Sequence, residues 1–248
     1  MVLKEFFQQN NRVALAFSGG VDSAYLLYAA SRLGAEVKAY YVKTPFQPQF
    51  EYEDALRLAA QLQVPMVTLE LDVLSDDTVT ANPQNRCYFC KKQIFSVILE
   101  QAKKDGFPLV IDGTNASDDV NDRPGMQALG ELGVRSPLRE CGLTKPEIRK
   151  LSKAVGLFTH DKPAYACLAT RIPTGTAITA ELLEKTEKSE AFLMGLGFSD
   201  FRIRLLGDAA RIQVKEKQIP LLIKHRQAII TELKKHYSAV LLDLEVRA

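Results

Sequence analysis

Residues 17–23 of the 248-residue chain read Phe-Ser-Gly-Gly-Val-Asp-Ser and contain the residue types that bind phosphate groups. The glycines let the backbone approach a ligand closely, and the hydroxyls of Ser18 and Ser23 can donate hydrogen bonds. A strand-like apolar run (residues 13–17) precedes this segment and a helix-like run (residues 24–30) follows it. A helix N-terminus presents free N–H groups and the positive end of its dipole. The pattern predicts an anion cradle rather than a chance turn, and it is not Walker A because no Gly-Lys-Ser/Thr follows.

The cysteines form a second candidate site. Cys87 and Cys90 stand three residues apart at the start of a predicted helix, where they share a face and the dipole stabilises thiolates. With Cys167 they can hold three irons of a 4Fe-4S cluster and leave the fourth iron open. The same thiolates, with His160, also suit zinc, and one CxxC is equally compatible with no metal at all. Cys141 fits no such pattern, so we expect it to be structural.

Alternating apolar runs and helical periodicities surround these sites. Strand candidates lie at residues 13–17, 37–42, 66–71, 109–111 and 134–138, and helix candidates at 51–62, from about 88, and at 144–155. The last of these helices opens with Thr144-Lys145-Pro146-Glu147, which is typical of a capping box. The alternation predicts an α/β fold with a doubly wound, mainly parallel sheet. Ligands of such sheets bind beyond the carboxyl ends of the strands. Both the segment at 17–23 and the Asp-Gly-Thr-Asn run at 112–115 follow predicted strands, so we expect them to meet.

Pro173-Thr174-Gly175 interrupts this alternation and divides the chain into expected domains at residues 1–172 and 173–248. The second is predicted as a small α+β domain with helices at 179–195 and 218–236 and strands at 201–205, 211–214 and 239–244. Arg202 and Arg204 alternate along a predicted strand and so point to one face. Paired guanidinium groups suit phosphate recognition, although a solvated sheet face with surface ion pairs has the same pattern.

Composition narrows the class of protein. The formal net charge of +2 gives no sign of the basic surface that binds nucleic acid. No apolar run approaches the length that spans a bilayer, and the N-terminus lacks the order of a signal peptide. Four cysteines in a chain of this size do not resemble a secreted disulfide framework. We therefore expect a cytoplasmic protein with no membrane contact.

Four strings together carry a specific resemblance. SGGVDS (residues 18–23), NRCYFCK (85–91), DGTN (112–115) and CLATRIPTG (167–175) occur in the order typical of LarE-type sulfur transferases. SGGVDS by itself resembles the signature of the PP-loop ATP pyrophosphatases, whose fold is adenine nucleotide alpha hydrolase-like. The likeness covers nearly the whole chain. At the C-terminus, Leu-Asp-Leu-Glu is followed by Val-Arg-Ala rather than a longer glycine- and tyrosine-containing tail, so any role of that tail is in doubt.

The resemblance implies an enzyme of nickel-pincer cofactor (lactate racemase) biosynthesis. Such enzymes use ATP to adenylate a carboxylate of pyridinium-3,5-biscarboxylic acid mononucleotide and then convert it to a thiocarboxylate. In some members the sulfur is that of the cysteine matching Cys167, which is left as dehydroalanine. In others three cysteines hold a 4Fe-4S cluster that carries sulfide. The presence of Cys87 and Cys90 beside Cys167 favours the cluster type over zinc.

The expected site residues follow from both lines of reasoning. ATP, with Mg²⁺, is expected at Ser18, Gly19, Gly20, Val21, Asp22, Ser23, Gly113, Thr114 and Arg123. Substrate binding is expected from Arg171, Glu190, Arg202 and Arg204. Catalysis is expected from Cys167, Asp22 and Arg171, and metal ligation from Cys87, Cys90 and Cys167. Glu190 is expected either to pair with the arginines or to bind a metal. The C-terminal domain is expected to bind substrate or to form the contacts of a homo-oligomer.

Two alternatives belong to other classes. A PP-loop tRNA thiolase adenylates and thiolates a uridine carbonyl and can also use three cysteines. The near-neutral charge and the lack of an RNA-binding module with interleaved aromatics argue against it. A non-catalytic ATP-binding sensor would use the cysteines as a redox or zinc switch and would release no pyrophosphate.

Overall fold

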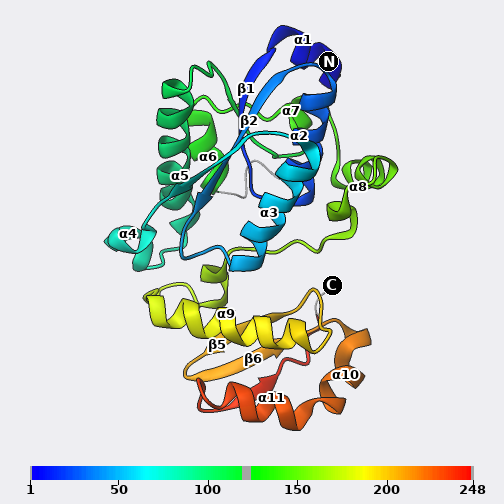
Figure 1. The fold of residues 1–248 in the computed structure, drawn as a ribbon. Helices are drawn as coiled ribbons and strands as arrows, with labels where there is room; N and C mark the ends of the chain where they lie inside the picture. Colours follow the sequence, from blue (N-terminus) through cyan, green and yellow to red (C-terminus); the bar gives the residue numbers. More distant parts are fainter. Residues whose placement is uncertain (1, 119–123, 247–248) are drawn as a thin grey trace. The chain divides into compact units, whose positions relative to one another are not determined.

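The structure, a computed structural model, describes residues 2–118 and 124–246. The chain divides into two compact units (Figure 1). Unit 1 comprises Met1–Val73 and Asn85–Lys162, and unit 2 comprises Leu74–Gln84 and Pro163–Ala248. A division into domains at residue 172 stays a prediction, whereas the short segment Leu74–Gln84 belongs to unit 2. In the described residues, no helix is both long and apolar enough to cross a membrane.

Unit 1 contains the expected parallel sheet. In its described part four strands are ordered β3-β2-β1-β4, and all neighbouring pairs are parallel. The strands are β1 (Arg12–Ala16), β2 (Glu36–Lys43), β3 (Met66–Glu70) and β4 (Val110–Ile111). The chain fills one side of β1 with β2 and β3 before β4 pairs on the other side. The carboxyl ends of β1 and β4 therefore form the switch point at which doubly wound sheets bind ligands.

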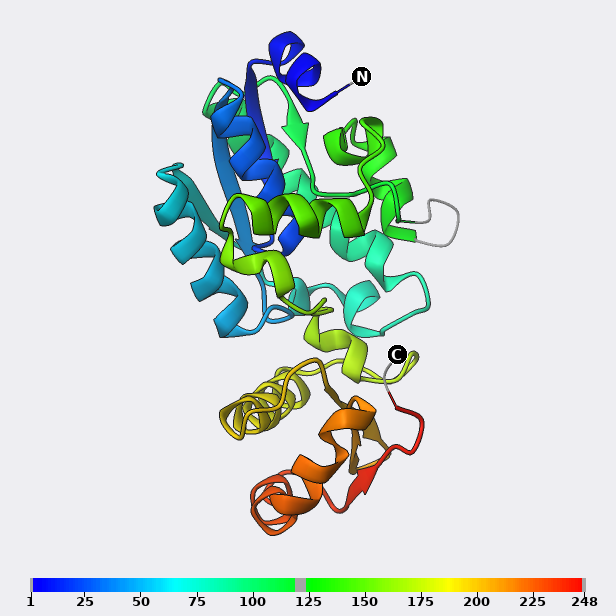
Figure 2. The ribbon, with the colours of Figure 1, turned by 90° about the vertical axis from the view of Figure 1, so that its right-hand side faces the viewer.

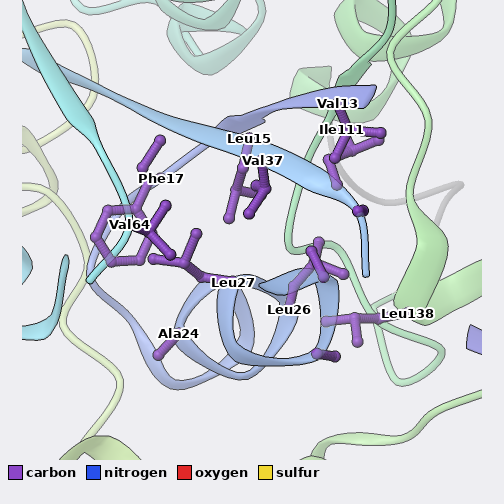
Figure 3. Close-up of a cluster of buried hydrophobic side chains, with 14 of the residues drawn as sticks. Val13, Leu15, Phe17, Ala24, Leu26, Leu27, Val37, Val64, Ile111 and Leu138 are labelled. Atoms are coloured by element: carbon purple, nitrogen blue, oxygen red, sulfur yellow. The ribbon is translucent and has the colours of Figure 1, made fainter. Parts of the chain in front are cut away.

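Helices cover both faces of this sheet, as the fold class predicts (Figure 1). The helices of unit 1 are α1 (Leu3–Gln9), α2 (Val21–Arg32), α3 (Gln49–Leu62), α5 (Arg86–Lys104), α6 (Pro124–Glu131), α7 (Pro137–Glu140) and α8 (Lys145–Ala154). Alternate β1 residues point to opposite faces: Val13 and Leu15 pack with α2, whereas Ala14 packs with α5. Figure 3 shows Leu26 and Leu27 of α2 packed beneath Leu15 and Val37. This packing fixes the strand–turn–helix unit that carries residues 17–23.

Helix α8 packs on α2 (Figure 2). Its N-cap, Thr144, forms the predicted capping box with Glu147, whose Oε2 accepts from Thr144 N at 2.8 Å. The box fixes the first residue of the helix, Lys145, against the start of α2. The capping signal is thus confirmed, and it positions a charged side chain as well as the helix.

The fifth predicted strand, at residues 134–138, is reduced to a single parallel bridge between Ile111 and Arg135. Pro137 lacks an N–H for a strand ladder and instead opens α7. The predicted helix at 218–236 is also divided, because the backbone leaves the helical region at His225 (φ −97°, ψ 10°). Its neighbours Lys224 and Arg226 are exposed.

Unit 2 is the expected small α+β arrangement. Its sheet, as described, is ordered β5-β6-β7, with β5 antiparallel and β7 parallel to β6. The elements are α4 (Asp77–Thr80), α9 (Ala180–Gly195), β5 (Arg202–Leu206), β6 (Ala209–Gln213), α10 (Ile219–Lys224), α11 (Arg226–Leu233) and β7 (Val240–Leu242). Short 3₁₀ turns lie at Leu168–Arg171 and Glu216–Gln218 in unit 2, at Phe158–Asp161 in unit 1, and at Val73–Ser75 where the chain passes from unit 1 to unit 2. One apolar cluster, which includes Leu193, Ile203 and Ile229, joins the helices to the sheet.

Candidate functional site

The turn between β1 and α2 has the geometry of an anion cradle. Gly19 adopts φ +71°, a conformation that side-chain-bearing residues rarely adopt. Gly20 is the N-cap of α2 and has no side chain with which to cap the first-turn N–H groups. The hydroxyl of Ser23 donates to Gly20 O at 3.2 Å and lies 3.1 Å from Ser18 Oγ. The start of α2 thus offers hydroxyls and backbone donors to an anion.

The segment after β4 packs directly on this cradle. A Cβ on Gly113 would lie 2.8 Å from Ser23 N and 3.1 Å from its Cα, so only glycine fits there. The buried carboxylate of Asp112 accepts from Thr114 Oγ1 at 2.5 Å and from Ser136 Oγ at 2.6 Å. These bonds fix the turn that brings Gly113 against α2. The two predicted nucleotide segments are therefore together in unit 1.

Asp22 has one carboxylate oxygen bound and one available. Oδ2 accepts a hydrogen bond from Lys145 Nζ, whereas Oδ1 is buried and has no hydrogen-bond partner among the described residues. Burial raises the pKa of Asp22, and the hydrogen bond from Lys145 opposes that shift. A buried, unpaired oxygen at a helix N-terminus fits a divalent cation that also contacts phosphate oxygens. The residues present therefore suit Mg²⁺.

The side chains of two other expected nucleotide residues, Val21 and Thr114, are buried. Val21 is buried in the apolar core, so it contributes backbone rather than side chain. Thr114 is buried and its hydroxyl donates to Asp112. Arg123 lies outside the described residues.

The CxxC motif occupies the first turns of α5. Cys87 is exposed and Cys90 is half-buried, and none of the four cysteines is joined in a disulfide. Tyr88 OH donates to Glu131 Oε2 at 2.7 Å and so ties this helix to α6. Among the described residues no group of three or more His, Cys, Asp or Glu side chains is gathered to hold a metal ion, so the cluster and the zinc site with His160 both stay predictions. Cys141 packs against the core, and burial raises the pKa of its thiol.

Cys167 belongs to unit 2, where a buried ion pair holds its loop. Arg171 is 1% exposed, and its Nε and Nη2 bind both oxygens of Glu190 at 2.9 and 3.0 Å. Arg171 Nη1 donates to Ala166 O at 2.7 Å and to Cys167 O at 3.2 Å. Glu190 also accepts from Tyr165 OH and from Ile203 N.

The two arginines of β5 bind other carbonyls of the same loop. Arg202 Nη2 donates to Ala164 O at 2.5 Å, and Arg204 Nη1 donates to Thr170 O at 2.9 Å. The Arg202 side chain is buried, and its guanidinium lies 5.1 Å from the ring centroid of Tyr165. The predicted substrate residues thus meet Cys167 in one cluster. Arg202 and Arg204 therefore contact the cysteine loop and do not lie on a solvated sheet face.

Sequence reasoning missed two members of these sites. Lys145 was interpreted only as the first residue of a capped helix, and its distance of 123 positions from Asp22 hides the contact. Tyr165 lies two residues before Cys167, and only its position in that loop could have singled it out. Burial, followed by the charge of Glu190, raises the pKa of Tyr165, so it remains a phenol donor.

Comparison with known proteins supplies independent findings. The family described as "Queuosine biosynthesis protein QueC" matches residues 12–97. A pyridinium-3,5-bisthiocarboxylic acid mononucleotide synthase of Lactiplantibacillus plantarum is 34% identical over 84% of this chain and 76% of its own length. An uncharacterized protein of Synechocystis is 38% identical over 88% of this chain and 81% of its own. A tRNA-specific 2-thiouridylase of Clostridium botulinum is 28% identical over 60% of this chain and 52% of its own.

Proposed function

Since the chain belongs to the family of LarE-type sulfur transferases within the PP-loop superfamily, we propose that it converts a carboxylate of pyridinium-3,5-biscarboxylic acid mononucleotide to a thiocarboxylate. The product would serve nickel-pincer cofactor biosynthesis. The family indicated by the four sequence strings is confirmed, and it is a family of ATP-using enzymes. The non-catalytic sensor is therefore set aside. The observation that carries the substrate assignment is the 34% identity to the Lactiplantibacillus synthase over 84% of the chain.

Adenylation belongs to unit 1 in this proposal. A substrate carboxylate oxygen attacks the α-phosphorus of ATP, the bond from that phosphorus to the β-bridging oxygen breaks, and pyrophosphate leaves. The first-turn N–H groups of α2 and the hydroxyls of Ser18 and Ser23 bind the pyrophosphate oxygens. Asp22, oriented by Lys145, would hold Mg²⁺, and the bound ion would supply positive charge beside the phosphates. Gly113 and Thr114 contact the nucleotide beside them.

Sulfur transfer completes the reaction. A sulfur nucleophile attacks the acyl carbon, and AMP leaves with the former carboxylate oxygen. If Cys167 donates its own sulfur, loss of its α-proton breaks the Cβ–S bond and leaves dehydroalanine. Attack needs an ionised sulfur because a neutral thiol is the weaker nucleophile. Arg202 and Arg204 on β5 are the proposed cations for the substrate phosphate, although each also binds a carbonyl of the cysteine loop, so phosphate would have to share or replace those bonds.

A three-cysteine cluster is the finer part of the proposal. The exposed Cys87 and half-buried Cys90 lie one helical turn apart in α5, a donor set that suits iron, and Cys167 would be the third ligand. A bound 4Fe-4S cluster would supply sulfide from its open iron and allow repeated turnover. The chain's own contribution is to present the thiolates and to hold the Cys167 loop.

The deciding experiment measures pyrophosphate release and thiolated product in parallel. We expect ATP to be split to AMP and pyrophosphate only when the dicarboxylate mononucleotide is present, and Cys167→Ala to release pyrophosphate while forming no thiocarboxylate. Release with tRNA in place of the mononucleotide would support the tRNA thiolase instead. Cleavage to ADP, or full activity of Cys167→Ala, would refute sulfur transfer through this loop.

The cluster has its own test. Anaerobically purified protein should be brown, contain iron and sulfide, and lose both in Cys87→Ser but not in the matched control Cys141→Ser. A colourless protein whose Cys167 loses the mass of H₂S after one turnover would establish self-sacrifice in place of a cluster.

A further inference from the structure

Each of the three guanidinium nitrogens of Arg171 donates to a partner inside unit 2. Its side chain is fully buried, and Nε and Nη2 are taken by Glu190. Its Nη1 binds within the cysteine loop, where it also donates to Thr170 Oγ1 at 2.9 Å. The Tyr165 ring covers the guanidinium at 4.4 Å from its centroid. To contact a substrate carboxylate, Arg171 would have to leave all of these partners.

Glu190 is committed in the same way. Oε1 accepts from Arg171 Nε and from Ile203 N, each at 2.9 Å, and Oε2 accepts from Arg171 Nη2 and Tyr165 OH. These bonds occupy the lone pairs of a carboxylate that is 1% exposed, which leaves no place for a metal ion. Glu190 is a residue of α9, so its side chain links that helix to strand β5 and to the cysteine loop.

We propose that Arg171 and Glu190 are a positioning pair: they fix the backbone of Cys167 for sulfur transfer and touch neither substrate nor metal. The pair anchors the carbonyls of Ala166 and Cys167, which flank the reacting side chain, to α9 and β5. A planar guanidinium in a bidentate ion pair is well suited to this, because its remaining donors have fixed directions. The expected effect on sulfur transfer rests on the proposed function, whereas the anchoring of the cysteine loop by the pair does not.

The test uses a double variant, because removing one partner would leave a buried charge unpaired and could unfold unit 2. Arg171→Met with Glu190→Gln removes both charges and keeps an oxygen that can accept from Ile203 N. The matched control is Glu184→Gln with Lys188→Met, an exposed ion pair on the same helix whose side chains are 64% and 60% accessible. Both proteins are compared with the unmodified chain.

Two readouts separate positioning from general stability. Amide hydrogen exchange, without substrate, should become at least fivefold faster in peptides from residues 163–171 and stay unchanged in β6 and in unit 1. The kcat for thiolated product should fall at least tenfold, with unchanged pyrophosphate release and an unchanged KM for the mononucleotide. The control variant should match the unmodified chain in both.

Three results would overturn the inference. A raised KM for the mononucleotide, with hydrogen exchange at residues 163–171 unchanged, would make Arg171 a substrate ligand. If neither the hydrogen exchange nor the kcat of the double variant differs from those of the unmodified chain, the pair has no positioning role. If the double variant does not fold, Arg171→Lys provides the test, because it keeps a charge for Glu190 but cannot also reach both loop carbonyls. Hydrogen exchange and kcat equal to those of the unmodified chain would then refute the positioning role. If the unmodified chain forms no thiocarboxylate, the proposed function fails, while the exchange comparison still decides whether the pair holds the loop.

Discussion

Lys145 and Asp22 form an ion pair across 123 positions of the chain, between the first residue of α8 and the first turn of α2. The lysine binds one carboxylate oxygen and leaves the other buried without a partner among the described residues. The capping box at Thr144 fixes where Lys145 begins the helix, and the packing of α8 on α2 brings it to the carboxylate. The pair thus orients Asp22 in the first turn of α2, within the predicted phosphate-binding segment.

Lys145→Met should therefore impair adenylation in a pH-dependent way. Burial already raises the pKa of Asp22, and the lysine counteracts this, so its loss raises the pKa further. More of the carboxyl is then protonated, and the acid limb of the pH profile of pyrophosphate release should move to higher pH. Loss of one charge-assisted hydrogen bond, worth about 1.5–3 kcal/mol, predicts a decrease of about 10–160-fold near neutrality. Lys150→Met, at an exposed site on the same helix, is the control, and an unmoved acid limb would contradict the role of the pair.

Gly113→Ala should abolish pyrophosphate release while the protein stays folded. The new Cβ would lie 2.8 Å from Ser23 N, so either the Asp112 turn or the start of α2 must shift, and the cradle opens. Gly130→Ala is the matched control, because a Cβ there meets nothing within 4 Å and the residue lies inside α6. That control should be neutral or more stable by up to about 1 kcal/mol. Calorimetry and ATP binding should both be measured for Gly113→Ala. A large drop in its melting temperature would show that the loss of activity comes from lost stability and not from the altered cradle.

The contrast between Asp22 and Lys145 also shows what the sequence could predict. The strand, glycine turn and helix around residues 17–23 are local, so their order and the fold class follow from periodicity and from SGGVDS. The placement of Gly113 beside Ser23 follows from a topological rule, since both segments end neighbouring parallel strands. Partners that meet through the packing of α8 on α2 leave no local signal, and Lys145 was missed for that reason.

In unit 2 the same limit appears in a different form. The alternation of Arg202 and Arg204 predicts a shared face, but not that the face is covered by the cysteine loop. Their donors bind carbonyls, and a carbonyl acceptor cannot be recognised from the identity of its residue. The predicted strand at 134–138 failed because Pro137 begins a helix there, a signal that was present and underweighted.

Asn82 should be a stability determinant of unit 2. Its Nδ2 donates to Pro173 O at 2.9 Å and to Thr176 O at 3.2 Å, and its φ of +55° is a left-handed conformation. Asn82→Gly keeps the backbone conformation but loses the amide, which predicts a loss of about 1–3 kcal/mol in the free energy of unfolding. Asn82→Ala adds the backbone cost of about 1–2 kcal/mol. Urea denaturation of both variants separates the two effects, and equal stability of the alanine and glycine variants would contradict the second.

Asp105, at the C-cap of α5, should govern part of the acid sensitivity of unit 1. Its Oδ2 accepts from Lys38 Nζ at 2.5 Å and from Tyr40 OH at 2.7 Å, which ties α5 to β2. The hydrogen bond from Lys38, and then that from Tyr40, lowers the pKa of Asp105 from 3.8 to about 2. A carboxyl whose pKa is lower in the folded state stabilises the fold above its ordinary pKa, and this stabilisation is lost as the pH falls through the folded value.

Asp105→Asn should accordingly be less stable than the unmodified chain at pH 7, and the difference should close as the pH falls from about 4 towards 2. Urea midpoints measured across that range provide the comparison. The matched control is Glu100→Gln on the same helix, whose ion pair with Lys104 is 67% and 62% accessible and should add little stability. A constant difference between Asp105→Asn and the unmodified chain down to pH 2.5 would mean that the bonds to Lys38 and Tyr40 do not depend on the ionised carboxylate.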